Sequence, residues 1–166
     1  IKGLQVPEPI LHIQNWSVSF GSTRVVSNAT LVVRKGKTTA IVGESGSGKS
    51  ITAMSILGLL PKHASVSGKI LFEQTDIATL SRSKMRLLRG KQIAMIFQEP
   101  MASLNPVFTI GEQIEEVFRL HKTCSRKLAK VKTKEILDEV GIQPNRSTAY
   151  PHEFSGGMQQ RVMIAM

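Results

Sequence analysis

Apolar and polar residues alternate along the first part of the chain with the period of β-strands. Residues 12–20 alternate as a half-buried strand does, and β-branched or aliphatic residues recur at 25–26 and 31–33. Glycine and polar residues gather at 21–23 and 34–37, where we predict turns. This part of the chain is therefore predicted to form strands joined by tight turns.

The pattern then changes from strand to helix across a glycine-rich segment. The β-branched run 38–42 leads directly into Gly43, and residues 50–60 form a predicted helix that Pro61 ends. A strand before a glycine-rich turn and a helix after it is the context in which phosphate-binding loops occur.

Two more strands and a basic helix are predicted in the middle of the chain. Residues 68–72 and 93–97 are apolar runs of strand length, and residues 81–90 between them are predicted to form the basic helix, which Gly90 closes. Gln98 follows the second run directly and begins a predicted polar loop.

The last part of the chain has a helical pattern. Thr109 and Glu112 have the spacing of a capping box, with apolar residues at helical intervals behind them. Residues 125–140 are predicted to form a second amphipathic helix, residues 144–151 a loop, and Ser155 opens a third helix.

Composition agrees with a soluble domain that has a real core. The chain has 166 residues, of which 41% are hydrophobic and 20% charged. The longest apolar stretch, residues 51–60, is too short to span a bilayer, and no secretory leader is visible. A single cysteine, Cys124, fits a reducing cytoplasm. Because the chain opens on Ile1 rather than Met, we expect the true start upstream.

The formal net charge of +10 raises the question of a nucleic-acid partner. The basic residues are spread along the chain, and aromatic residues make up only 5%, without the basic–aromatic interleaving that stacks bases. We therefore interpret the charge as solvated helix faces and expect no nucleic-acid partner. Contact with anionic lipid headgroups is the alternative.

Residues 43–50 match the phosphate-loop pattern G-x-x-x-x-G-K-[ST] without a mismatch. Glycines let the backbone approach a phosphate closely, and successive N–H groups then converge on it at the start of a helix. Lys49 adds a positive charge for the β- and γ-phosphates, and the Ser50 hydroxyl suits Mg²⁺. The predicted ATP-binding residues here are Gly43, Glu44, Ser45, Gly46, Ser47, Gly48, Lys49, Ser50 and Ile51.

A second glycine motif occurs more than a hundred residues later, within F-S-G-G-M-Q-Q at 154–160. Ser155, Gly156 and Gly157 are either a helix start with a serine cap or a second anion site built from a hydroxyl, glycine N–H groups and a positive helix end.

Together these motifs resemble the ATP-binding-cassette (ABC) family. Segments 43–55, 93–105 and 150–166 look most like ATP-binding subunits of bacterial dipeptide, oligopeptide and nickel importers. Phe154 and Met158 depart from the general signature, which has Leu and Gln there, but are similar to this importer branch.

The resemblance implies roles that the residues alone leave open. Gln98 would contact Mg²⁺ and the attacking water, which makes it the catalytic residue and, with Ser50, a metal ligand. Phe20, otherwise an ordinary strand aromatic, would stack on adenine. Ser155, Gly156 and Gly157 would close on the γ-phosphate held by a partner subunit.

The resemblance also implies the fold. We expect an α/β P-loop NTPase (ABC ATPase) with an N-terminal antiparallel β subdomain and an inserted helical subdomain, incomplete at the C-terminus. The expected single domain runs from a β subdomain (1–37) through a P-loop core with a strand insert (38–98) and a helical subdomain (99–154) to the start of the signature helix (155–166). The family's catalytic Glu, its neighbouring Asp and its switch His would follow Met166, so we expect the 166 residues alone to be inactive.

The expected function is that of an importer ATPase at the cytoplasmic face of the membrane. ATP binding and hydrolysis would drive uptake of peptides, nickel or a related solute. The implied partners are a second ATPase subunit in a head-to-tail dimer, transmembrane permease subunits and, indirectly, a solute-binding protein. A non-hydrolytic nucleotide-binding fragment and a soluble ABC ATPase of repair or translation are the alternatives.

Overall fold

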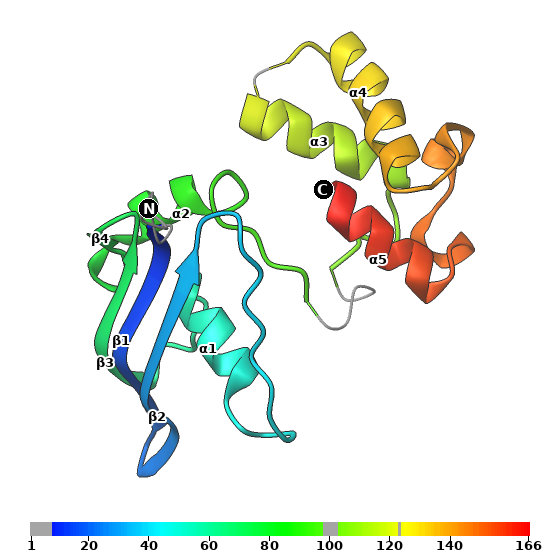
Figure 1. The fold of residues 1–166 in the computed structure, drawn as a ribbon. Coiled ribbons are helices and arrows are strands. Elements are labelled where there is room, and N and C mark those ends of the chain that lie inside the picture. The colour runs from blue at the N-terminus through cyan, green and yellow to red at the C-terminus, as the bar shows by residue number, and fades with distance from the viewer. Residues whose placement is uncertain (1–7, 98–102, 123) are drawn as a thin grey trace, which may run out of the picture. The chain divides into compact units, whose positions relative to one another are not determined.

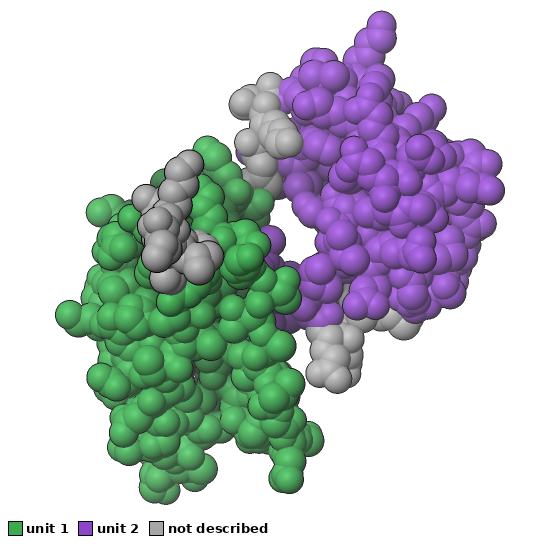
Figure 2. All heavy atoms as spheres, in the orientation of Figure 1, with its two compact units in different colours: residues 1–93 green, residues 94–166 purple. Residues whose placement is uncertain are grey.

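The computed structural model describes residues 8–97, 103–122 and 124–166. The chain divides into two compact units, residues 1–93 and 94–166 (Figure 2). Each unit has its own buried apolar core.

Unit 1, residues 1–93, holds the strands and two helices (Figure 1). Its elements are β1 (Pro9–Phe20), β2 (Thr23–Arg34), α1 (Lys49–Ile56), β3 (Ala64–Phe72), β4 (Thr75–Asp76), the 3₁₀ turn η1 (Ile77–Thr79) and α2 (Arg82–Leu88). The strands form one antiparallel sheet in the order β2-β1-β3-β4. The expected N-terminal antiparallel β structure is therefore confirmed, with β3 and β4 added to it from beyond the glycine loop.

A β-bulge in β1 keeps the apolar side chains on one face of the sheet. Asn15 has φ of 48° and adds one residue to β1 between the pairs Gln14↔Lys69 and Ser17↔Ser67. Gly68 lies opposite the bulge with φ of 100°, and a Cβ there would be 2.5 Å from the carbonyl oxygen of Asn15. Only glycine fits at this position without moving the backbone.

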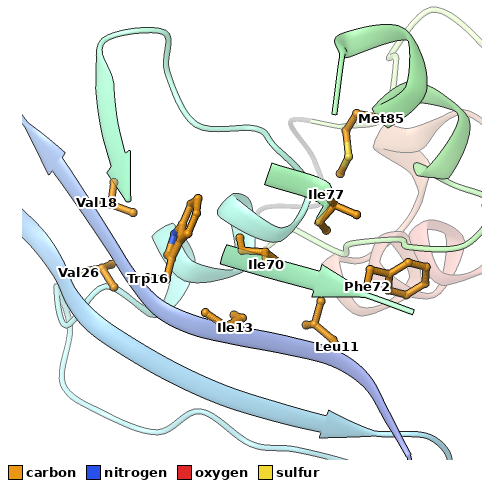
Figure 3. Close-up of a cluster of buried hydrophobic side chains, with 9 residues drawn as sticks. All are labelled: Leu11, Ile13, Trp16, Val18, Val26, Ile70, Phe72, Ile77 and Met85. Atoms are coloured by element: carbon orange, nitrogen blue, oxygen red, sulfur yellow. The ribbon is translucent and has the colours of Figure 1, made fainter. Parts of the chain in front are cut away.

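The core of unit 1 lies on that face of the sheet (Figure 3). Because of the bulge, Leu11 and Ile13 before it and Trp16 and Val18 after it all point into the same cluster. The cluster is completed by Val26 from β2, Ile70 and Phe72 from β3, Ile77 from η1 and Met85 from α2.

The predicted strands over 38–42 and 93–97 are wrong for this structure. Neither run joins a sheet within the described residues; Ile93 makes only an isolated bridge with Arg89. Val42 is 88% exposed. An apolar run becomes a strand only when another strand pairs with its backbone, and no described strand pairs with either run.

Two other predicted boundaries also shift. The helix predicted over 50–60 begins at Lys49 and ends at Ile56, because Gly58 adopts a left-handed φ of 60°. Residues 144–151, predicted to be a loop, contain the 3₁₀ turn η3 (Pro144–Thr148) and the start of η4 (Pro151–Glu153).

Unit 2 is helical, with α3 (Ile110–Lys122), α4 (Arg126–Glu139), η3, η4 and α5 (Gly156–Ala165) (Figure 1). The predicted capping box is confirmed: the Thr109 N–H donates to Glu112 Oε2 at 2.8 Å, and the Glu112 N–H donates to Thr109 Oγ1 at 3.3 Å. Ser155 caps α5, as predicted, and Ser125, predicted to be the first residue of its helix, is the cap of α4.

The core of unit 2 draws its side chains from α3, α4 and α5, from the segments between them and from the segment before α3. Its members are Leu104, Ile110, Ile114, Leu137, Ile142, Ala149, Phe154 and Val162. In the described part of the chain, no helix has the length and apolar character needed to cross a membrane.

Candidate nucleotide-binding site

The glycine loop between β2 and α1 is shaped by two left-handed glycines. Gly46 has φ of 81° and Gly48 has φ of 86°, a region that other residues rarely adopt. A Cβ on Gly48 would lie 3.0 Å from both the Val25 carbonyl oxygen and Val26 Cγ2. The last turn of the loop is therefore packed directly against β2.

Lys49 folds back over this loop. Its Nζ donates to the carbonyl oxygens of Gly43 at 2.8 Å and Glu44 at 2.6 Å, and to Ser47 Oγ at 3.2 Å. An ammonium group has three donors, so these contacts use all of them. The arrangement holds a positive charge over the loop that the sequence pattern assigns to phosphate.

Helix α1 follows immediately and is anchored at its start. The Thr52 hydroxyl donates to the Gly48 carbonyl oxygen at 2.9 Å, and Ile51 packs against the core of unit 1. Ser50 lies exposed in the first turn. That turn has no acidic residue, so the partial positive charge of the helix end is not cancelled locally.

Phe20 lies at the end of β1, in the same unit as the glycine loop. It packs against the edge of the core on the face that carries Val18, and its ring centroid is 5.5 Å from that of His63. Val18 pairs with Val26, and Val26 lies beside Gly48 of the loop. Phe20 is two residues beyond Val18 on β1, which places it roughly 7 Å further along the strand. The Phe20 ring and the glycine loop therefore lie on the same side of the sheet. No sequence pattern links His63 to Phe20, because the two residues come from separate elements.

The second glycine motif lies at the start of α5 in unit 2. Ser155 Oγ accepts from the Met158 N–H at 3.4 Å. A Cβ added to Gly156 or Gly157 would meet nothing within 4 Å in the described part of the chain. Behind the motif, the Gln159 side chain donates to the carbonyl oxygens of Pro151 and Phe154. The Gln159 hydrogen bonds therefore hold the start of α5 in place, while Gly156 and Gly157 are exposed.

Gln98 lies outside the described residues, so its predicted role stays a prediction. Ser50, its predicted partner in holding Mg²⁺, is described above. Among the described residues there is no group of three or more His, Cys, Asp or Glu side chains that could hold a metal ion.

Comparison with known proteins identifies the family. Residues 26–166 match the model of the family described as "ABC transporter". The chain belongs to the ABC transporter family.

Curated relatives of this ABC chain include transport ATP-binding proteins from several bacteria. The dipeptide transport ATP-binding protein DppD of Bacillus subtilis is 46% identical over 96% of this chain and 50% of its own length. The peptidoglycan transport ATP-binding protein YejF of Agrobacterium fabrum is 50% identical over 96% of this chain and 31% of its own length. The chain therefore spans half or less of the length of these relatives.

Solved ABC structures share the fold. The dimeric cassette MJ0796 has a TM-score of 0.80 at 25% identity, over 93% of this chain and 67% of its own. CbiO1 from Clostridium perfringens has a TM-score of 0.76 at 25% identity, over 95% of this chain and 60% of its own. The fold is that of an ABC ATPase cassette, as expected from the motifs.

The glycine loop of this ABC chain fits the nucleotide that the family binds, which is ATP. The two left-handed glycines, the lysine held over the loop and the uncancelled end of α1 are the features that a polyphosphate needs.

Proposed function

We propose that these residues are the nucleotide-binding part of an ABC importer subunit, which couples ATP binding and hydrolysis to the uptake of peptides or a related solute. The observation that carries the proposal is the loop from Gly43 to Ser50, with Lys49 folded over it at the start of α1. The names of the relatives, which include dipeptide, oligopeptide and glutathione transport proteins, support the substrate class.

In this proposal the backbone of the loop binds the phosphates of ATP. The N–H groups between Ser45 and Ser50 donate to the β-phosphate, and Ile51 continues the first turn of α1 against the core. Lys49 exchanges its contacts with the loop oxygens for contacts with the β- and γ-phosphates. Bound Mg²⁺ would neutralise phosphate charge during hydrolysis, and Ser50 and Gln98 are the residues proposed to hold it.

Two further groups of residues complete the proposed site. Phe20 stacks on the adenine ring, since it lies on the same side of the sheet as the loop. Ser155, Gly156 and Gly157 bind the γ-phosphate of a nucleotide held by a second ATPase subunit, in a head-to-tail dimer. Their open position at the start of α5 supports this assignment.

The proposed setting is the cytoplasmic face of the membrane. The second ATPase subunit and transmembrane permease subunits are direct partners, and a solute-binding protein acts through the permease. Units 1 and 2 would together form one ATPase domain, with unit 2 supplying the helical subdomain and the signature helix.

The test replaces Lys49 by Ala, with Lys37→Ala as a matched control from the exposed segment before the loop. Loss of the ammonium group should weaken ATP binding at least about tenfold, or 1.4 kcal/mol, because the phosphates lose their opposing charge. Lys37→Ala should keep the wild-type affinity. Calorimetry measures both values.

The same substitutions, made in a full-length subunit that contains these residues, test the transport function in cells that lack the gene for that subunit. Uptake of a labelled dipeptide should return with the wild-type protein and with Lys37→Ala, but not with Lys49→Ala. Equal ATP affinity in the two variants would contradict the loop assignment. Normal ATP binding without restored peptide uptake by the wild-type protein would contradict the proposed peptide transport and leave the loop assignment standing.

A further inference from the structure

The segment that leads into the signature helix α5 is short and has little regular structure of its own (Figure 1). Its turn η4 has three residues, and Phe154 after it is extended, with φ of −107° and ψ of 140°. Backbone hydrogen bonds from the N–H groups of Glu153 and Phe154 close the turn. One such turn does not fix where Ser155 lies, so contacts from outside the segment matter for its position.

Two side chains from outside the segment bind its carbonyl oxygens. Gln159, which is 2% exposed, donates through Nε2 to the carbonyl oxygens of Pro151 at 2.8 Å and Phe154 at 3.2 Å. Arg146 donates through Nη2 to the Glu153 carbonyl oxygen at 2.8 Å. Gln159 belongs to α5 itself, whereas Arg146 belongs to η3. Arg146 therefore ties the segment before Ser155 to a separate element.

Arg146 also contacts the next residue along the segment. Its Cζ lies 4.8 Å from the centroid of the Phe154 ring, within the range of a cation–π contact. Phe154 is 5% exposed and belongs to the core of unit 2. The Arg146 Nε is buried and makes no hydrogen bond within the described part of the chain. The guanidinium is thus held between the Glu153 carbonyl oxygen and the Phe154 ring, which precede Ser155 directly.

The element that carries Arg146 is fixed to the start of α3. The Ile110 N–H donates to the carbonyl oxygen of Ala149, at the end of η3, at 2.9 Å. A Cβ on Gly111 would lie 2.7 Å from the Ser147 carbonyl oxygen, so the two backbones are in close contact. Arg146 therefore reaches the segment before Ser155 from an anchored position.

We propose that Arg146 is a positioning residue for the signature motif, residues 155–157. It holds Glu153 and Phe154 so that the Ser155 hydroxyl and the glycine N–H groups keep the direction in which they meet the γ-phosphate. This inference rests on the function proposed above for that motif. Arg146 is not assigned to a phosphate, because its guanidinium already binds a carbonyl oxygen and packs on a ring. A small displacement of groups that contact a reacting phosphate lowers the rate strongly.

The first experiment uses the full-length subunit that contains these residues, alone and in the assembled transporter. Arg146→Met keeps an unbranched side chain that packs on an aromatic ring but removes the donor to Glu153. It should lower kcat for ATP hydrolysis at least about tenfold and leave the ATP affinity of the isolated subunit within about twofold of wild type. Arg146→Lys, which keeps a donor, should lose less.

A control separates positioning from a general loss of stability. Ile114→Val makes a small cavity in the core of the same unit and should keep the wild-type kcat. Wild-type kcat in Arg146→Met, a larger loss in Arg146→Lys, or an equal loss in Ile114→Val would each overturn the proposal.

The second experiment combines Arg146→Met with Gly157→Ala. If Arg146 acts through the motif, Arg146→Met should lower kcat by less than about twofold once Gly157 is replaced. An additive loss would overturn the proposal, because Arg146 would then act independently of the motif. Full hydrolysis in Gly157→Ala would remove the function proposed for the motif and this inference with it. Loss of hydrolysis in Gly157→Ala with the wild-type rate in Arg146→Met would remove this inference alone.

Discussion

At the scale of single residues, the structural reason for glycine differs between the two glycine motifs. Gly48 is constrained by its own fold, because its φ is left-handed and β2 occupies the space that a side chain would need. Gly157 has no such constraint among the described residues, since a Cβ there would meet nothing within 4 Å. If the proposed signature role is right, glycine is needed at position 157 because a ligand or partner approaches the backbone closely there.

Gly157→Ala tests this difference. The thermal midpoint should stay the same or rise, because alanine is favoured over glycine in a helix by up to about 1 kcal/mol. ATP hydrolysis by the assembled transporter should fall at least about tenfold, because the methyl group blocks the approach of the γ-phosphate. Gln160→Ala, an exposed change in the same helix, is the control and should leave the hydrolysis rate unchanged. Full ATPase activity in Gly157→Ala would show that Gly157 has no role in binding the γ-phosphate.

At the scale of elements, strands and helices are held in place by a few local devices. The bulge at Asn15 and the glycine opposite it set the register of β1 against β3. The capping box at Thr109 and Glu112 fixes where α3 begins. Each device can be removed by one substitution, and its effect can be measured against a neutral position.

Gly68→Ala should destabilise unit 1 by roughly 3 kcal/mol or more. The new Cβ would be 2.5 Å from the Asn15 carbonyl oxygen, and φ of 100° is strained for alanine. Gly21→Ala is the matched control, because its φ is also left-handed but a Cβ there has free space. It should cost only about 1 kcal/mol. Denaturant titrations compare the two, and equal losses would show that the bulge does not constrain position 68.

Glu112→Gln should remove a pH dependence of stability. The pKa of Glu112 is lowered in the folded protein, chiefly by the backbone N–H of Thr109. Its contribution is therefore complete above the unfolded pKa near 4.5 and is lost as pH falls through the lower folded value. The difference in thermal midpoint between wild type and variant should stay constant from pH 7 to about 4.5 and shrink as the pH is lowered further. A difference that does not shrink well below pH 4.5 would show that the charge of Glu112 does not stabilise α3.

These elements also show which parts of the fold the sequence can predict. Capping residues and helical spacing are local, so the starts of α3, α4 and α5 were predicted correctly. The strands over 38–42 and 93–97 were not, because a strand depends on a partner elsewhere in the chain. The bulge at Asn15 and the ring contact between Phe20 and His63 are likewise set by tertiary contacts that no local pattern encodes.

At the scale of the whole molecule, residues 38–42 and β1 differ in how their backbone groups are hydrogen-bonded. None of the N–H groups of residues 38–42 donates a hydrogen bond within the described part of the chain, whereas β1 is paired on both sides. Amide hydrogen exchange on the 166-residue chain should therefore be fast at 38–42 and slow in β1. Slow exchange at 38–42 would show that this run has found a strand partner.

The two separate cores have a consequence for how the stability of this chain is defined. Cooperative unfolding joins residues that share a packed interior, and the clusters around Ile13 and around Ile114 share no side chain. Substitutions in different clusters remove contacts from different sets of side chains, so their effects on stability should combine additively. The free energy of unfolding of a double variant that combines one substitution from each cluster measures this.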